Sequence, residues 1–315
     1  MPTGIQLLPA PPGRPVAALA LGQFDGVHPG HRAVLEAAAA LARDAGGAAA
    51  ALTFSPPPDR ILHPERPPEA LATPEENRAL LLACGIDAVA LLPFTPDLAT
   101  TPPGDFLALL VRAFPGLRAL ATGWNFTFGR GAAGNAENLP ALAANHGLTV
   151  RVVPPVLHGG LPVASTRIRD ALRDGDIPLA AALLGRPYAI SGEVVRGRQV
   201  GRSIGFPTAN LIPAPGILLP HPGVYVASVQ TAPGAPSRRA AAFLPDPDDP
   251  RQQFAGGAVE VHIPDFEGDL YGRRLRLAFR RRLRGHHNFD TLEALATQLR
   301  RDMEIVRQTE EGIRQ

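Results

Sequence analysis

The sequence contains no lysine, so its 31 basic residues are all arginine. The absence of lysine excludes a Schiff-base mechanism and the lysine of a phosphate-binding P-loop. Cysteine is almost absent as well. Because Cys84 is the only one, the chain can form no intramolecular disulfide and no cysteine-based zinc site. This usage is typical of a protein from a reducing compartment.

An excess of charge of one sign is also missing. The formal net charge is +2, which is too small for binding nucleic acid by broad electrostatics. Long apolar runs are missing too, since the run at 16–22 is short and leads into Gln23 and Asp25. Residues 1–15 are too rich in proline for a signal peptide. We therefore expect a cytoplasmic protein that binds neither nucleic acid nor a membrane, while its oligomeric state stays open.

The chain is long enough for two domains, since it has 315 residues of which 45% are hydrophobic. In its first part, short apolar runs alternate with helical stretches. The expected strands are 16–21, 48–54, 89–92, 117–122 and 148–153. The expected helices are 32–45, 105–113, 136–145 and one that opens at a Thr73, Pro74 and Glu76 capping box. This alternation predicts a parallel sheet covered by helices on both faces, with ligands at the carboxyl ends of its strands.

The pattern changes near Gly185, where strands separated by glycine and proline replace the alternation. The expected strands are 188–195, 224–229, 258–263 and 275–282. They precede one long helix, 291–308, with Asp290 and Glu293 as its capping pair. Strands followed by a single helix favour a small antiparallel barrel. We therefore predict an α/β protein with two domains, 1–184 and 185–315.

The first candidate site is the segment GQFDGVHPGH, which follows the first expected strand. Gly22 and Gly26 permit close approach to a ligand or a positive φ. His28 and His31 are three residues apart at a helix start, so their rings share one face. Free amides there attract anions, and two imidazoles would hold a triphosphate and stabilise charge on leaving pyrophosphate. The alternatives are turn glycines with surface histidines, or a metal site, which no cysteine or acidic cluster supports.

The second candidate site combines a glycine-rich loop with a later strand. The loop GRQVGRSIGFPTAN has glycines at 197, 201 and 205, whose backbone amides are free to wrap phosphates. It has no Walker lysine, so it is not a P-loop. Glu260 lies in AVEVHIPDFEGDLYG, on a strand that alternates apolar and polar residues. By itself this glutamate would be a solvent-facing strand residue.

Together these motifs resemble the prokaryotic bifunctional riboflavin kinase/FMN adenylyltransferase (FAD synthetase) family. The histidine segment is similar to the HxGH motif of nucleotidyltransferases. Four other segments are similar to family stretches: LLPFTPDLA at 91–99, the flavin-side loop GWNFTFGRG at 123–131, ASTRIRDAL at 164–172, and the kinase motif PTAN at 207–210. The resemblance covers about 16–307. It implies a Rossmann-like nucleotidyltransferase domain and a C-terminal antiparallel barrel kinase domain with a terminal helix.

The resemblance also implies roles for single residues. In the first domain, His28 and His31 would be catalytic, and ATP or phosphate would contact Gly22, Phe24, Asp25, Gly26, Ser165, Thr166 and Arg167. Flavin would contact Asn125, Phe126 and Phe128. In the second domain, Glu260 would be the general base for the riboflavin hydroxyl, and ATP or phosphate would contact Gly201, Arg202, Thr208 and Asn210. Thr208 and Asn210 would also hold Mg²⁺. The implied substrates and products are riboflavin, ATP, FMN and FAD.

The sequence departs from the family pattern at three places. Pro57 stands where a PHP motif has histidine, AAAFLPDPDDP at 240–250 replaces a segment like NIGxRPT, and Gly285 and His286 replace an acidic pair. These departures keep two rival functions open. One is a single-function FMN adenylyltransferase with a decayed kinase half. The other is a regulator that binds flavin or nucleotide without turnover.

Overall fold

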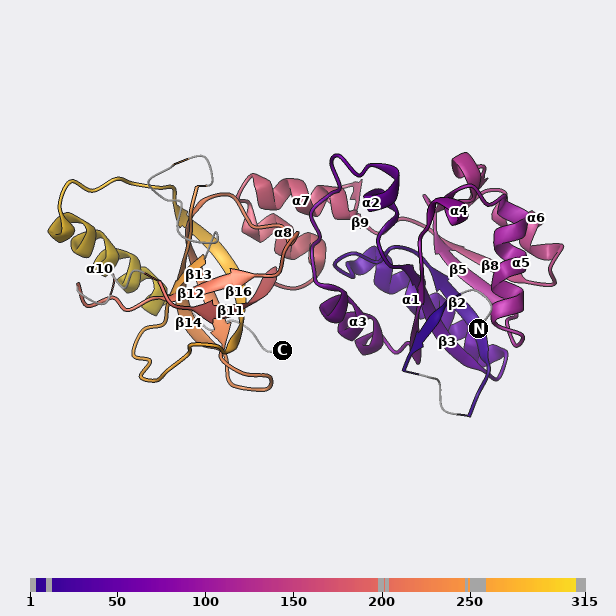
Figure 1. Ribbon diagram of the computed structural model, residues 1–315, viewed down its shortest axis with the longest axis horizontal. Coiled ribbons are helices and arrows are strands. Elements are labelled where there is room, and N and C mark those ends of the chain that lie inside the picture. The colour runs from indigo at the N-terminus through magenta and orange to yellow at the C-terminus, as the bar shows by residue number, and fades with distance from the viewer. Residues whose placement is uncertain are drawn as a thin grey trace. The chain divides into compact units, whose positions relative to one another are not determined.

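Figure 1 shows the computed structural model, which describes residues 4–9, 13–197, 201, 204–246, 249 and 259–309. The chain folds into two compact units, Met1–Ser165 and Thr166–Gln315. The first contains a sheet with helices, and the second contains a closed antiparallel barrel and a terminal helix. The predicted fold class is therefore confirmed. Within the described ranges, no helix is both long and apolar enough to cross a bilayer.

The sheet of the first unit has six strands in the order β1-β4-β3-β2-β5-β8. Their bounds are β1 Gln6–Leu8, β2 Val16–Leu21, β3 Ala48–Phe54, β4 Ala88–Leu92, β5 Ala119–Gly123 and β8 Thr149–Val153. Strands β2, β3, β4, β5 and β8 pair in parallel, as predicted. The sequence analysis missed β1, which adds antiparallel to the β4 edge. Its three residues are too few to show a periodic pattern.

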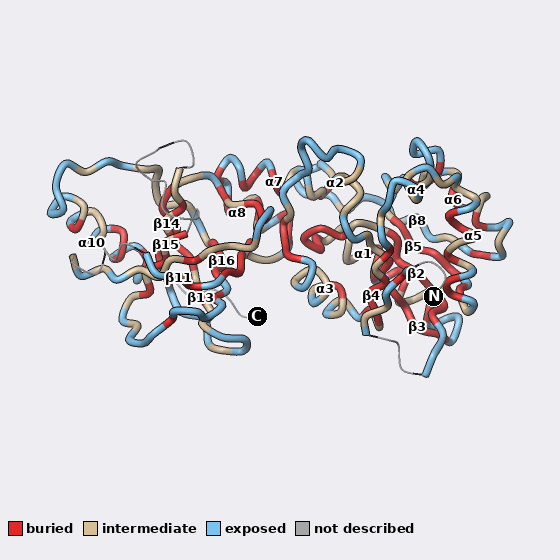
Figure 2. Tube along the Cα trace, viewed as in Figure 1, coloured by how far each residue is buried: buried red, intermediate tan, exposed pale blue. Residues whose placement is uncertain are grey.

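Helices cover both faces of this sheet. Their bounds are α1 Pro29–Asp44, α2 Pro58–Leu62, α3 Pro74–Ala83, α4 Pro96–Ala99, α5 Pro103–Ala113 and α6 Leu139–Ala144. Along β2, Leu19 and Leu21 join a core cluster with α5, whereas Ala18 and Ala20 join another with α1. Burial on both faces explains why β2 is apolar throughout, as its colour in Figure 2 shows. The capping box at Thr73 and Glu76 is confirmed.

The second unit is built around a closed barrel in the order β11-β12-β15-β14-β13-β16. Its strands are β11 Ala189–Val195, β12 Ala209–Pro213, β13 Gly223–Gln230, β14 Arg238–Leu244, β15 Val259–His262 and β16 Arg274–Arg284. Helix α7, Ser165–Arg173, starts at the last residue of the first unit, and α8, Ile177–Leu184, ends at Gly185 in the left-handed conformation. The terminal helix is α10, Leu292–Gln308.

Two predictions about the barrel unit are corrected. The sequence analysis treated residues 240–250 as a loop that stands in place of the family's NIGxRPT segment. In the structure, residues 240–244 belong to β14, which pairs with β13 and β15. Alanine has little preference for strands, so the pairing with two neighbours decides the conformation here. The α10 cap is Thr291, whose hydroxyl accepts from the Ala294 amide, and not the predicted pair of Asp290 and Glu293.

Candidate active sites

The loop that follows β2 has an unusual backbone. Phe24 and Val27 have φ values of 54° and 40°, and Gly26 has a φ of 76°. Left-handed φ values are costly for residues with bulky side chains, and such strain persists only where the surroundings hold the backbone in place. Both Phe24 and Val27 are buried, which secures their side chains.

Hydrogen bonds with residues from distant parts of the first unit hold this loop. The Leu71 amide donates to both carboxylate oxygens of Asp25, at 3.0 and 3.1 Å. The Gly26 amide donates to Asn77 Oδ1 at 3.0 Å, and the Ser165 hydroxyl donates to the Asp25 carbonyl at 3.0 Å. Asp25 is only 7% exposed. Asp25 therefore shapes the loop, because its carboxylate accepts hydrogen bonds from the Leu71 backbone amide. Its negative charge would also repel a phosphate.

His28 and His31 lie together at the start of α1. His28 is the N-cap, and its Nδ1 accepts from the His31 amide at 3.3 Å. Because Nδ1 is the acceptor, the proton of the neutral His28 ring is on Nε2. The two rings stack with centroids 3.6 Å apart, and Phe24 contacts His31 edge-on. The two histidines therefore lie together as predicted, although His28 is the N-cap with extended backbone and not a residue of the helix.

Burial lowers the pKa of His31 well below its ordinary value, and the neighbouring His28 lowers it further. His31 is therefore neutral near pH 7. A neutral imidazole donates one hydrogen bond to an anion without carrying the cost of a buried charge. Among the described residues, no hydrogen-bond partner reaches the buried Nδ1 of His31. This stacked pair is a preorganised polar group at a helix N-terminus.

The His31 pKa leads to a testable pH dependence. The unfolded chain titrates near 6.5, whereas the folded pKa is lower. Below pH 6.5 the unfolded state binds more protons, so stability falls as the pH is lowered through this range. We expect the urea midpoint of the first unit to drop between about pH 7 and about pH 5.5, and His31→Asn to remove part of that drop. An equal drop in the variant would assign the dependence to other groups.

The loop 123–131, predicted to contact flavin, contains both exposed and buried residues. Asn125 is exposed, and Phe126 is partly buried, but Phe128 is 7% exposed. The Phe128 ring packs on Phe126 and Phe106, each with centroids 5.6 Å apart. This loop contains the small strands β6, Thr127–Phe128, and β7, Gly134–Asn135. Phe128 therefore contributes mainly to the core, and Asn125 is the residue of this group with the most access to a ligand.

The second predicted site comes together in the barrel. Glu260 on β15 is paired across the sheet with Asn210 on β12 and with Phe243 on β14. The Thr208 hydroxyl donates to Glu260 Oε2 at 3.3 Å. Three residues from two separate sequence motifs thus meet at one place, where Phe243, missed by the sequence analysis, adds an aromatic side chain.

The loop before β12 approaches itself closely. The Phe206 amide donates to the Gly201 carbonyl at 2.8 Å, and a side chain at Gly201 would collide with the Phe206 carbonyl. Position 201 therefore requires glycine. Arg202 lies outside the described residues. Thr166 and Arg167, predicted contacts of the first site, lie in α7 in the second unit.

A cavity of about 570 Å³ adjoins Glu260. This volume is in the range of pockets that hold small molecules. Its lining combines the predicted Gly201, Thr208, Asn210 and Glu260 with residues of β14, the 286–291 segment and α10. The lining residues that sequence reasoning missed include Phe206, Phe243, His262, Arg284, His286 and Phe289. A signal existed for His262, which is two residues after Glu260 and therefore on the same face of an alternating strand.

His262 supports the geometry of the Thr208 segment. Its Nδ1 donates to the Pro207 carbonyl at 2.8 Å, and its ring contacts Phe206 edge-on. Burial lowers the pKa of His262, so the ring is neutral near pH 7. The bond joins β15 to the residue just before Thr208.

The donor set fits a magnesium ion that is shared with phosphate. Thr208 and Asn210 offer a hydroxyl and an amide oxygen beside the Glu260 carboxylate, and hard oxygen ligands suit Mg²⁺. Magnesium usually keeps few protein ligands and completes its shell with phosphates and water. The described part of the chain contains no cluster of three or more histidine, cysteine, aspartate or glutamate side chains that could hold a metal ion.

Two family models match the chain. Residues 12–167 match the model described as FAD synthetase, and residues 184–309 match the one described as riboflavin kinase. Three curated relatives are called bifunctional riboflavin kinase/FMN adenylyltransferase. The protein of Pseudomonas fluorescens is 35% identical over 294 residues, 91% of each chain. That of Escherichia coli strain K12 is 34% identical over 286 residues, 90% of each chain, and that of Bacillus subtilis strain 168 is 30% identical over 288 residues, 91% of this chain and 90% of the relative.

A solved structure agrees with the fold. Titled a macrolide-efflux protein from Streptococcus pneumoniae, it matches with a TM-score of 0.83 and 30% identity, covering 94% of this chain and 95% of that one. Since the family models match both units and the curated relatives match along both, the chain belongs to the bifunctional riboflavin kinase/FMN adenylyltransferase family, whose members use ATP to make FMN and then FAD.

Proposed function

We propose that the barrel cavity is the riboflavin kinase site and that Glu260 is its general base. The observation that carries this proposal is the meeting of Thr208, Asn210 and Glu260 at the edge of the 570 Å³ cavity. The riboflavin 5′-oxygen attacks the ATP γ-phosphorus, the bond to the ADP oxygen breaks, and the hydroxyl proton passes to the Glu260 carboxylate. The apolar residues of the cavity suit the flavin ring.

We propose that Thr208 and Asn210 hold Mg²⁺ at this site. When bound, the ion neutralises charge on the phosphates of ATP. The hydrogen bond to Glu260 fixes the orientation of the Thr208 hydroxyl, and the β12–β15 pairing holds Asn210 beside Glu260. The amides near Gly201 are proposed to hold phosphate, together with Arg202.

In the first unit, the loop around His28 and His31 is the proposed centre of adenylyl transfer. An FMN phosphate oxygen attacks the ATP α-phosphorus, and pyrophosphate leaves. No base is required, because the phosphate is already ionised. The His28 and His31 rings donate hydrogen bonds to the triphosphate, and Gly22, Phe24, Asp25, Gly26 and Ser165 give the loop its shape. Thr166 and Arg167 remain proposed phosphate contacts, and Asn125 and Phe126 remain proposed flavin contacts with Phe128 behind them.

We propose that the two activities divide as residues 1–184 and 185–315. The family models support this division, since one ends at residue 167 and the other begins at 184. The packing boundary lies earlier, because the His221 amide donates to the Leu172 carbonyl and α8 packs on β16. Helices α7 and α8 therefore fold with the barrel. A cytoplasmic location is also proposed, supported by the single cysteine.

One experiment tests this assignment. We expect purified protein with riboflavin, ATP and Mg²⁺ to yield FMN and then FAD when the flavins are separated by chromatography. FAD formed only from supplied FMN would instead indicate a decayed kinase half. No product from either flavin would indicate a regulator without turnover.

A further inference from the structure

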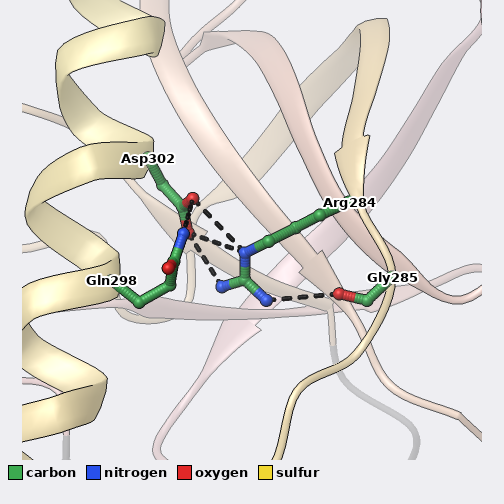
Figure 3. Close-up of polar contacts among 4 residues, drawn as sticks. All are labelled: Arg284, Gly285, Gln298 and Asp302. Atoms are coloured by element: carbon green, nitrogen blue, oxygen red, sulfur yellow. Dashed lines mark hydrogen bonds and ion pairs between the residues drawn. The ribbon is translucent and has the colours of Figure 1, made fainter.

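A buried ion pair joins the end of β16 to the terminal helix. Arg284 Nη2 donates to Asp302 Oδ2 at 2.8 Å, and Arg284 Nε donates to both carboxylate oxygens, at 3.3 and 3.2 Å. Gln298, one turn earlier on α10, donates to Asp302 Oδ1 at 2.9 Å. Figure 3 shows these contacts converging on the carboxylate. The Asp302 side chain is only 2% exposed, so its charge depends on these partners.

The same guanidinium also holds the segment that leads to α10. Arg284 Nη1 donates to the Gly285 carbonyl at 3.2 Å, as Figure 3 shows, and the guanidinium carbon lies 6.0 Å from the centre of the Phe289 ring. One side chain therefore connects three parts of the unit: the barrel, the segment 285–291, and α10. Apolar packing of Met303 and Val306 on the barrel adds to the same docking.

These connected parts form a wall of the cavity. Its lining includes the segment 286–291 and, from α10, Leu292, Leu295, Leu299 and Met303. The phosphate-side residues are instead Thr208, just before β12, and Glu260 on β15, and the pairing of these strands does not involve Arg284. A change at Arg284 therefore displaces the wall formed by 286–291 and α10 without removing any group proposed for the chemistry.

We propose that Arg284, acting with Asp302 and Gln298, is a positioning residue that sets the riboflavin-binding wall of the kinase cavity. This inference rests on the proposed function of that cavity. The fork of the guanidinium is essential to the role, because three nitrogens with fixed directions reach one carboxylate and one carbonyl. A lysine ammonium keeps the charge but lacks this geometry.

The test is the steady-state kinetics of the full chain carrying Arg284→Lys or Asp302→Asn. We expect the KM for riboflavin to rise by about tenfold, with kcat and the KM for ATP close to wild type. FMN-to-FAD turnover, measured in the same samples, should not change. The matched control is Arg307→Lys. Arg307 lies on α10, like Asp302, but it pairs with Asp265 on the surface, where the two side chains are 57% and 82% exposed.

A double variant separates positioning from stability. Arg284→Met with Asp302→Leu replaces the ion pair by apolar side chains, which restores stability in other proteins. It removes the bond to Gly285, so a folded double variant should keep the raised KM. If either single variant or the folded double variant has the same KM for riboflavin as the wild type, the inference is overturned. The kinase assignment still stands in that case, provided that the unmodified protein forms FMN. No FMN from the unmodified protein would overturn both.

Discussion

Replacing Glu260 with glutamine should slow riboflavin phosphorylation by about 10²–10⁴-fold. Glutamine keeps the shape of the side chain and an oxygen that can accept from Thr208, but it cannot take the hydroxyl proton. The measurement is riboflavin-to-FMN turnover at increasing riboflavin for wild type and variant. The loss should appear in kcat, because the proton moves only in the transition state.

FAD formation from supplied FMN is the internal control for this variant, since the His28 and His31 loop proposed for adenylyl transfer lies in the other unit. Glu267→Gln is a matched surface control, because Glu267 follows β15 and is exposed. Equal FMN turnover in wild type and Glu260→Gln would mean that Glu260 is only a strand residue. Its hydrogen bond with Thr208 would then be structural.

The second large effect is expected at the stacked histidines. His28→Ala or His31→Ala should lower FMN-to-FAD turnover by about 10²–10³-fold, because each removes a hydrogen-bond donor to charge that develops on the leaving pyrophosphate. His28→Ala also removes the α1 N-cap, so its effect on stability is measured separately by urea unfolding. Riboflavin-to-FMN turnover should be unaffected in both variants.

His146→Ala is the matched control for these substitutions. His146 lies in the same unit, just after α6, and has no part in the loop around His28. Normal FAD formation in both His28→Ala and His31→Ala would show that the first site is misassigned. Loss of FMN formation as well would show that the two activities are not separable in the proposed way.

The departures from the family pattern have different structural consequences. Residues 240–244 still complete the barrel as part of β14, and Phe243 lines the cavity beside Glu260. Of the acidic part of that segment, Asp246 and Asp249 are described, whereas Asp248 is not. Pro57 precedes α2 and offers no hydrogen-bond donor for a phosphate. The kinase architecture is thus retained at the positions where its chemistry is proposed.

The local pattern of residues determined much of this molecule. Short apolar runs that alternate with helical stretches predicted the parallel strands. A strand that is buried on both faces of a sheet needs apolar residues along its whole length. The spacing of His28 and His31 at a helix start predicted that their rings lie close together, and the N-cap bond of His28 to the His31 amide brings this about in the structure. The PTAN segment and Glu260, in contrast, indicated the second site only through their resemblance to the family.

Tertiary structure alone decided which distant residues meet. The β14 strand arises from pairing with β13 and β15, not from its alanines. Asp25, which the sequence suggested as a phosphate contact, is occupied by the Leu71 amide, 46 residues away. Arg284 finds Asp302 only because α10 returns to the barrel. Propensity and capping act over a few residues, whereas a buried carboxylate takes whichever donors the folded chain brings to it, and no local pattern specifies those donors.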